Sequence, residues 1–579
     1  MIYSFDTFYL DTLRRLLLHG EQSLTLTPRI FDTLLYFVEH NGRVISKEEL
    51  MKAVWPDAFV EENNLTQSIS NLRRVLGERK GENRFIVTVP GYGYRFAAKV
   101  TTRASVSDSA PPTQRRIAVL PFKPLVEKHQ DEALQLGMAD ALIIRLSSSR
   151  EMIVRPLTSV RRFVAMDQDP QLAGNELEVD LVLDGNIQRA EDRIRVSARL
   201  INVGDGASLW AGTFDEKFTD VFSVQDAISE RVAEALKIQF TQQARHGLTK
   251  RYTGNTAAYE LYLQGRYHWS KLIPSEVRKA ISYFQQAIAI DANYALAYTG
   301  MAVAYISLPV SCDEQPQDAF PKAKEAALTA LHIDQSLHDA HAYLAFVSFW
   351  FGWDWAAAET HIKTGIVLNP DSAELHRAYG ILLSQTGRTH EAIAEGIRAR
   401  ELDPLSLITR VNEALFFYFA RDFETAQKKI DQTLELEPNF WVAQLTRARI
   451  YVQQGRLDEA IADLTKARDI CMGSTQPLAT LGYVLAKKGQ HQDALRILAE
   501  MERVASQRYV PPYNFALIFL GLGDHEQTFT WLDRAYGARD VLLAAFINNE
   551  PAWDEVRETK RFRELLRLMK LSNSNLSRI

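Results

Sequence analysis

The sequence predicts a multidomain, mostly α-helical protein with an N-terminal α+β domain, a small central α/β domain and a C-terminal α-solenoid. Three observations predict this organisation. The chain has 579 residues, more than one hydrophobic core usually organises. The stretch from Thr101 to Gln114 consists mainly of small polar residues and prolines, which is typical of a linker. Beyond residue 255, small residues recur every 34 positions.

Residues 1–100 are expected to combine short strands with three helices. Three short apolar segments predict small strands: Tyr3 to Phe8, Leu13 to Leu18 and Ser23 to Leu26. Thr27 and Pro28 predict the start of the first helix, because proline is favoured at the first helical position. A capping box from Ser46 to Glu49 predicts a second helix that runs through Trp55.

The third expected helix, Asn63 to Gly77, has one apolar side and one side without the usual surface charges. At 100° per residue, four apolar residues form a single stripe: Leu65, Ile69, Leu72 and Leu76. The opposite side carries Asn63, Gln67, Ser70, Asn71 and Arg74, flanked by Arg73. Amide side chains can grip an adenine edge, and arginine pairs with guanine or phosphate. A face that is merely solvated is the alternative.

Local charge favours contact with nucleic acid. Residues 1–62 carry six Lys/Arg and ten Asp/Glu, a balance of −4. Residues 63–100 carry seven Lys/Arg and two Asp/Glu, a balance of +5. This second range also contains two predicted strands joined by a glycine-bearing turn, from Arg84 to Phe96. Positive charge therefore gathers on the third helix and the hairpin, as expected of a surface that faces a duplex.

Residues 3–100 resemble the OmpR/PhoB-type winged helix-turn-helix domain. The motifs that carry the resemblance are Leu26-Thr27-Pro28, Gly42 to Leu50, Val54-Trp55-Pro56, Leu72 to Leu76 and Gly91 to Phe96. The resemblance implies an N-terminal sheet, a recognition helix in the major groove of double-stranded promoter DNA, and a hairpin wing beside the minor groove. It also implies that the loop from Pro56 to Val60 contacts RNA polymerase. No receiver domain precedes Met1, so input is expected through residues 115–579.

The same resemblance implies roles for individual residues. Its base-facing positions are Gln67, Ser70 and Asn71. Its positions for holding phosphate or a base edge are Arg73 and Arg74. Its backbone-touching positions are Trp55, Thr88 and Tyr94. The expected DNA-binding set is completed by Asn63 on the same helix face and by Tyr92 at the wing tip, where Pro90 replaces a basic residue found in many relatives.

Residues 115–245 are expected to form the small α/β domain, after the linker 101–114. Its elements are predicted at Ile117 to Phe122, Leu134 to Leu146, Ile153-Val154, Leu181 to Leu183, Arg193 to Leu200 and Asp226 to Phe240. The region resembles the α/β domain of TolB-N-like and FlgO-like proteins, on motifs that include Ala118 to Phe122, Val182 to Gly185 and Phe222 to Asp226. Three aspartates, Asp131, Asp180 and Asp184, are interpreted as turn and cap residues rather than metal ligands.

The helical region 255–540 repeats with a period of 34 residues. Alanine keeps this step at Ala358, Ala392, Ala426, Ala460 and Ala494, and proline keeps it at Pro370, Pro404 and Pro438. A third register is Gly380, Ala414, Ala448, Gly482 and Ala516. This is the tetratricopeptide (TPR) signature, in which small residues let paired helices approach. A TPR superhelix offers a groove for a protein or peptide, and residues 541–579 are expected to cap its last repeat.

Composition and motifs argue against several other classes of protein. Cys312 and Cys471 form no Cys-x-x-Cys pair, so neither a disulfide framework nor a zinc site is expected. The most apolar run, Tyr343 to Trp353, is too short to span a membrane, and no export signal is recognisable. Phosphate-loop, His-Glu-x-x-His and Gly-x-Ser-x-Gly motifs are missing. We therefore expect a cytoplasmic, bacterial non-enzyme without catalytic residues, cofactor, metal or membrane partner.

Together these expectations predict a sequence-specific DNA-binding transcription regulator without a receiver domain. Its N-terminal domain would bind promoter DNA and RNA polymerase, while its signal would enter through the α/β and TPR regions. The rival hypothesis is a TPR scaffold or adaptor whose winged helix binds no specific DNA. A membrane-linked sensor of the CadC/ToxR kind is a third hypothesis, weakened by the missing transmembrane segment.

Overall fold

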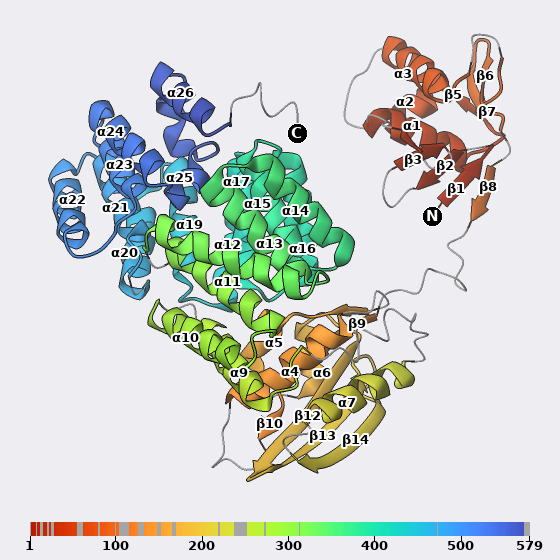
Figure 1. Ribbon diagram of the computed structural model, residues 1–579. Helices are drawn as coiled ribbons and strands as arrows, with labels where there is room; N and C mark the ends of the chain where they lie inside the picture. Colours follow the sequence, from red (N-terminus) through yellow and green to blue (C-terminus); the bar gives the residue numbers. More distant parts are fainter. Residues whose placement is uncertain are drawn as a thin grey trace. The chain divides into compact units, whose positions relative to one another are not determined.

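The computed structural model divides into two compact units, Met1–Thr113 and Gln114–Ile579 (Figure 1). The structure describes residues 2–6, 8–11, 16–19, 22–24, 28–54, 62–78, 82–98, 100–103, 115–124, 132–147, 152–164, 169–217, 221–236, 252–270, 274–311, 313–471 and 473–571. Each unit has a hydrophobic core of its own.

The first unit begins with an antiparallel sheet in the order β4, β3, β2, β1, β8. Its strands are β1 Ile2–Phe5, β2 Phe8–Asp11, β3 Leu16–His19, β4 Gln22–Leu24 and β8 Val100–Arg103. Two predictions were wrong. The segment Tyr3 to Phe8 is a hairpin rather than one strand, because the chain turns at Asp6 with φ 51°. The linker was placed too early, since residues 101–103 supply backbone partners to the edge of β1.

Three helices and a second small sheet complete this unit; the sequence predicted the helices and two of the three strands. The helices are α1 Pro28–Glu39, α2 Lys47–Val54 and α3 Glu62–Val75. The sheet has the order β5 Val44–Ser46, β7 Gly93–Phe96, β6 Ile86–Val89. Ser46 Oγ accepts a hydrogen bond from Glu49 N at 3.1 Å and caps α2. Gly93 is required where β7 meets β5, because a Cβ there would lie 2.0 Å from Ile45 O.

The second unit begins with a mixed sheet in the order β11, β9, β12, β13, β14, with β10 paired to β12. Its strands are β9 Arg115–Val119, β10 Lys123–Pro124, β11 Met152–Val154, β12 Leu181–Ala190, β13 Arg193–Asn202 and β14 Ser208–Lys217. Its helices are α4 Glu132–Leu146, α5 Leu157–Val160, η2 Arg161–Val164, α6 Pro170–Glu176 and α7 Val221–Ala235. The predicted small α/β domain is therefore present. Sequence analysis missed β14, because no position of that strand is fully buried and no apolar alternation marks it.

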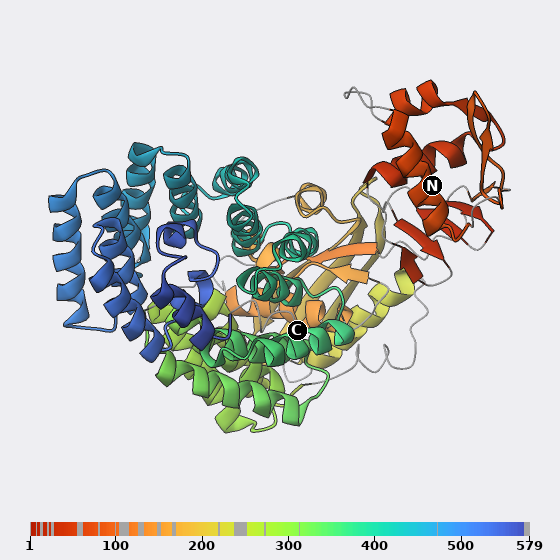
Figure 2. The same ribbon diagram turned by 90° about the horizontal axis from the view of Figure 1, so that it is seen from above.

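Antiparallel helix pairs follow, stacked side by side along the chain (Figures 1 and 2). The first four pairs are α9 Thr256–Ser270 with α10 Pro274–Ile290, α11 Ala295–Ser311 with α12 Pro316–Ile333, α13 His338–Phe346 (extended by η4 Val347–Gly352) with α14 Trp355–Leu368, and α15 Ala373–Gln385 with α16 Thr389–Leu402. The next four are α17 Leu407–Phe419 with α18 Phe423–Leu436, α19 Trp441–Gln453 with α20 Leu457–Ile470, α21 Gln476–Lys487 with α22 His491–Ala505, and α23 Pro512–Gly521 with α24 His525–Gly537. A Cβ on Gly380 would lie 2.6 Å from the Phe416 ring, which explains a small residue at this periodic position. The predicted solenoid is confirmed.

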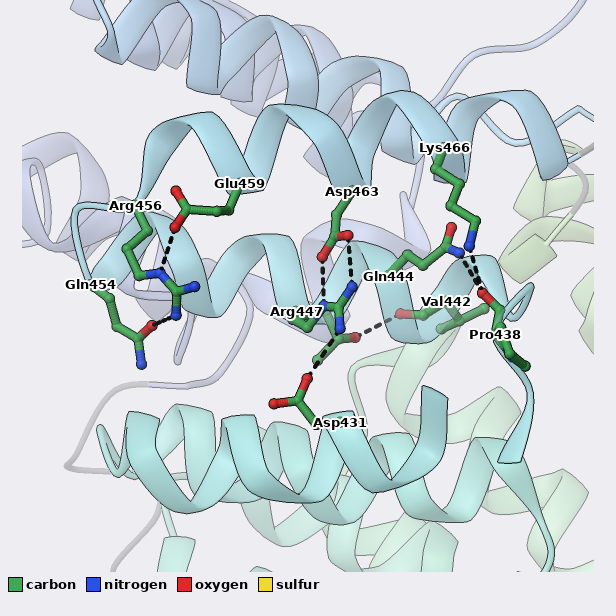
Figure 3. Close-up of polar contacts among 11 residues, drawn as sticks. Asp431, Pro438, Val442, Gln444, Arg447, Gln454, Arg456, Glu459, Asp463 and Lys466 are labelled. Carbon is green, nitrogen blue, oxygen red and sulfur yellow. Dashed lines mark hydrogen bonds and ion pairs between the residues drawn. The ribbon is translucent and has the colours of Figure 1, made fainter. Parts of the chain in front are cut away.

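Hydrogen bonds and ion pairs connect neighbouring repeats, as Figure 3 shows for α18, α19 and α20. Arg447 of α19 donates to both carboxylate oxygens of Asp463 at 2.7 and 2.8 Å, and to Asp431 of α18 at 3.1 Å. The carbonyl oxygen of Pro438 accepts from Gln444 at 2.8 Å and from Lys466 at 3.0 Å. One arginine thus bridges two repeats, while one inter-helix turn is held from both following helices.

The C-terminal segment comprises α25 Val541–Phe546, η5 Pro551–Glu555 and α26 Lys560–Leu568. It packs on the last repeat, where Trp553 Nε1 donates to Tyr513 Oη at 3.0 Å. It also returns to the middle of the array, because Trp355 Nε1 donates to Met569 O at 2.9 Å and Arg421 pairs with Asp554 at 2.9 Å. The expectation of a cap on the last repeat alone was incomplete.

The α/β domain is joined to the array through Arg155, which is fully buried. Its Nη1 donates to Glu401 O at 2.6 Å and to Leu402 O at 2.8 Å. Beside it, Thr158 Oγ1 donates to Asp403 at 2.6 Å. These bonds connect residues more than 240 positions apart within one unit. Among the described helices, none has the length and apolarity needed to cross a bilayer.

Candidate nucleic-acid interface

Helix α3 separates a buried stripe from an exposed polar face. The four predicted stripe residues are almost completely buried: Leu65, Ile69, Leu72 and Leu76. On the other side, Gln67, Ser70 and Arg74 are exposed and Asn71 is half-buried. The stripe packs against α1 and α2. The polar face can therefore meet a partner without any loss of core contacts.

The amide of Asn71 is held by a neighbouring arginine. Arg74 Nη2 donates a hydrogen bond of 2.9 Å to Asn71 Oδ1. The two residues are three positions apart, which puts their side chains on adjacent turns of one helix face. A carbonyl oxygen has two lone pairs, so Asn71 can keep this bond and still accept from a base. The contact orients the amide before any DNA arrives, which reduces the ordering cost of binding.

Arg73 links α3 to the wing. Its Nη2 donates to Ile86 O and to Thr88 Oγ1, both at 2.8 Å. The sequence predicted Arg73 and Thr88 as separate DNA contacts, and the structure brings them together instead. The bonds leave Nε and Nη1 of the five-donor guanidinium outside this contact. Arg73 is therefore a positioning residue for the wing as well as a candidate phosphate ligand.

Glu78 makes a second link between the same two elements, one that sequence analysis missed. Gly77 takes φ 69° and ends α3, as a glycine at a helix C-terminus commonly does. The following glutamate is buried, and its carboxylate accepts from the backbone N–H groups of Phe85 and Ile86 at 3.3 Å each. No apolar periodicity marks Glu78. In the charge count it only lowered the net positive charge of residues 63–100.

The residues predicted to contact DNA from the wing differ in how exposed they are. Tyr92 follows Gly91 in the turn between β6 and β7 and is 59% exposed. Thr88 is exposed next to Arg73, as described above. Tyr94 is only 5% exposed, because it lies on the side of β7 that faces the core. We therefore leave Tyr94 out of the proposed surface, and note that Arg95, the exposed neighbour on β7, was not singled out from the sequence.

Several predicted features lie outside the described residues. These are Trp55, the side chain of Asn63, the loop Pro56 to Val60, and the cations Arg79, Lys80 and Lys99. Arg84 forms an ion pair with Asp6, so part of the predicted positive balance is neutralised within the unit. No cluster of three or more potential metal-ligating side chains occurs in the part of the chain that the structure describes.

An exposed amide and arginine face beside a hairpin wing, joined to a helical repeat array, defines a transcription regulator of the OmpR/PhoB type with a TPR region. Residues 20–96 match the family described as transcriptional regulatory protein, C terminal. Residues 412–475 match the tetratricopeptide repeat family.

Individual relatives span different parts of the chain. The transcriptional regulator HilA of Salmonella typhi is 26% identical over 436 residues, which are 74% of this chain and 76% of HilA. A putative adenylate cyclase 3 of Rhizobium meliloti (strain 1021) is 26% identical over 243 residues, 41% of each chain. The transcriptional activator CadC of Escherichia coli (strain K12) is 41% identical over 83 residues, 14% of this chain and 16% of CadC. The solved DNA-binding domain of Escherichia coli CadC is 31% identical, covers 18% of this chain and 96% of that domain, and has a TM-score of 0.17.

Proposed function

We propose that the protein binds promoter DNA in a sequence-specific manner through α3 and the wing, and that its signal enters through the second unit. The observation that carries the proposal is the exposed face of α3, on which Arg74 orients the amide of Asn71. Amides choose bases in the major groove, and arginines hold phosphate or guanine. A helix face built only for solvation has no need of an amide held in one orientation.

The proposed roles follow from these positions. Gln67, Ser70 and Asn71 contact base edges, with Asn63 on the same face. Arg74 holds phosphate, and Arg73 and Thr88 set the position of the wing. Trp55 contacts the DNA backbone, and Tyr92 reaches the duplex from the wing turn.

Input is proposed to pass through the α/β domain and the TPR array, and the proposal includes no receiver domain. A protein or peptide partner would occupy the TPR groove, and the loop Pro56 to Val60 would contact RNA polymerase. The site of action is the cytoplasm. The names of HilA and CadC support regulation of transcription, and we propose no enzymatic activity despite the relative named as a putative adenylate cyclase.

Selection of bound fragments from sheared genomic DNA tests the proposal with the full chain. We expect the recovered fragments to share a sequence motif. Asn71→Ala serves as a matched variant, because it retains the arginines and should recover DNA with a weaker motif. Recovery without any shared motif would favour the scaffold hypothesis, in which assembly through the TPR array is the function.

A further inference from the structure

The second unit contains a partly open cavity of about 1650 Å³ between the α/β domain and the helical array. The α/β domain contributes residues such as Ile143, Met152 and Leu157 to its wall. The array contributes residues from the first helices of successive repeats, and α25 adds Leu542 and Phe546. We call this cavity the junction chamber. Both modules therefore contact whatever fills it.

Four side chains of the chamber wall have a buried polar atom without a hydrogen-bond partner. Trp350 is 8% exposed, Gln385 3% and Asn412 9%, and the side chain of Arg266 is 23% exposed. The unpartnered atoms are the indole Nε1, the amide Oε1, the amide Nδ2 and the guanidinium Nε, respectively. Leaving such a group unpaired is costly, and native proteins rarely leave several in one place. Three donors and one acceptor on the wall of one chamber point to a bound molecule with matching groups.

Most charged groups of the wall are already paired with an opposite charge. Arg266 pairs with Asp140 at 3.2 Å, and Arg377 pairs with Glu374 at 2.6 Å. Similar pairs involve other lining residues: Arg162 with Glu176, Asp371 with Arg398, and Asp339 with His338. A charged ligand would have to break one of these pairs or remain unpaired in a poorly hydrated site, and both are costly. The wall therefore selects against charge.

Aromatic rings form much of the remaining wall. The rings come from Trp269, Tyr343, Phe346, Trp350, Phe416 and Trp441. Phe346 and Trp350 pack against each other with ring centroids 4.6 Å apart. Large aromatic faces with a few directed polar groups are the usual composition of a site for organic ligands.

We propose that the junction chamber binds an uncharged organic molecule whose hydrogen-bond donors and acceptors alternate with apolar faces. The inference rests on the proposed role of the second unit as the input module, and it names the chemistry of the signal. Because the first helices that line the chamber also form the TPR groove, this ligand would take the place in the groove that is otherwise proposed for a protein or peptide. Since the α/β domain and the array form opposite walls, the ligand stabilises one arrangement of the two modules.

Titration calorimetry and thermal unfolding of the full chain test this with two neutral probe classes. One class is neutral trisaccharides, and the other is tripeptides acetylated at the N-terminus and amidated at the C-terminus. Their charged counterparts are trisaccharides of uronic acids and the same tripeptides with free termini. We expect one neutral class to bind with one site per chain and to raise the midpoint of unfolding. Its charged counterpart should bind at least about tenfold more weakly. The class that binds identifies the source of the ligand. The proposal would be overturned if neither neutral class bound at millimolar concentration, or if the charged probes bound as tightly as the neutral ones. The chamber would then be filled by water.

Two shape-conserving variants separate binding from structure: Asn412→Leu and Gln385→Met. Each removes an unpaired polar atom, so the ligand-free protein should unfold at the same temperature or higher, while the neutral probe should bind about tenfold more weakly. A purely structural role predicts the reverse, with a lower midpoint and unchanged binding. Trp531→Phe is the control, because that indole stacks on Phe515 away from the chamber. Calorimetry needs no DNA, so loss of DNA selectivity would overturn the proposed function without touching this result.

Discussion

Arg73 of α3 donates a hydrogen bond of 2.8 Å to Thr88 Oγ1 of β6, and the same nitrogen donates to Ile86 O at 2.8 Å. Helix α3 and the wing are therefore connected by one guanidinium. Glu78 adds a second tie from the end of the helix to the backbone of β6. A change on α3 can consequently alter the wing, so the two arginines of this helix should behave differently when they are replaced.

Replacement of Arg74 should weaken binding to every duplex. Arg74→Ala removes one expected phosphate contact, so the dependence of binding on salt should flatten by about one unit of slope. Arg73→Ala should weaken binding too, and should also lower the free energy of unfolding by about 1 kcal/mol, because Ile86 O and Thr88 lose their donor. Anisotropy titrations at several salt concentrations and urea unfolding measure both effects. Arg43→Ala is the control, since its guanidinium pairs with Glu49 at 3.1 Å. An unchanged salt slope in both α3 variants would show that this face does not meet DNA.

Replacement of the amides should weaken binding to the preferred DNA sequence rather than binding to DNA in general. Asn71→Ala or Gln67→Ala should cost about 1–3 kcal/mol on the preferred site and leave binding to scrambled DNA nearly unchanged. Folding should persist, because neither residue belongs to the buried stripe. Paired titrations of specific and scrambled duplexes at fixed salt provide the measurement, and we expect the larger loss for Asn71. Equal losses on both duplexes would instead assign these residues to the DNA backbone.

The first unit should fold alone, and it should be more stable when β8 is included. A fragment of residues 1–113 retains the pairing of β8 with β1, whereas a fragment that ends at residue 99 leaves the edge of β1 unpaired. We expect cooperative thermal unfolding of the longer fragment, and a lower midpoint or aggregation of the shorter one. Circular dichroism with light scattering distinguishes these cases. Identical unfolding curves would mean that β8 contributes nothing to the sheet.

Arg155 should hold the α/β domain to the array. Arg155→Met leaves carbonyl groups of Leu177, Glu401 and Leu402 without their donor, at about 1–3 kcal/mol for each buried group. Calorimetry of the second unit in the full chain should then show the α/β domain unfolding in a separate, earlier transition. Arg193→Met is the control, because its pair with Asp215 is exposed and should contribute little to stability. A single transition in the Arg155 variant would contradict this role.

Asp540 should make stability depend on pH. Burial raises the pKa of this carboxyl to about 7, although it accepts hydrogen bonds from the backbone N–H groups of Tyr513 and Leu542. Aspartate in an unfolded chain has a pKa of about 4, so between these values the folded protein holds a proton that the unfolded chain releases. The stability from this group is complete below about pH 4 and is lost as pH rises through about 7.

Asp540→Asn should therefore flatten the decline of the unfolding free energy between about pH 4 and 7, as measured by urea titrations at several pH values. Asp524→Asn is the matched control, because Asp524 caps α24 in the same way but is exposed. An unchanged slope in the Asp540 variant would show that another group governs the pH dependence.

Features of short sequence range were predictable. The 34-residue step located the helix pairs, since each pair repeats one packing solution, and the stripe Leu65 to Leu76 assigned the buried side of α3. Capping chemistry likewise predicted the start of α2 at Ser46. The polar face of α3 could be predicted from the same periodicity. Most of the candidate site could therefore be located from the sequence alone.

The sequence by itself determined the kinds of element, their order and which side of α3 is polar, because these depend on residues within one or two turns of each other. Only the tertiary structure decided that β8 closes the first sheet, that Arg73 and Glu78 hold the wing, and that Tyr94 faces the core. It also decided that the C-terminal segment returns to the middle repeats and that a chamber opens between the α/β domain and the array. These features join residues that lie from 7 to 214 positions apart. No local period or cap encodes such contacts, because they arise only when packed elements bring unmatched hydrogen-bonding groups and apolar faces together.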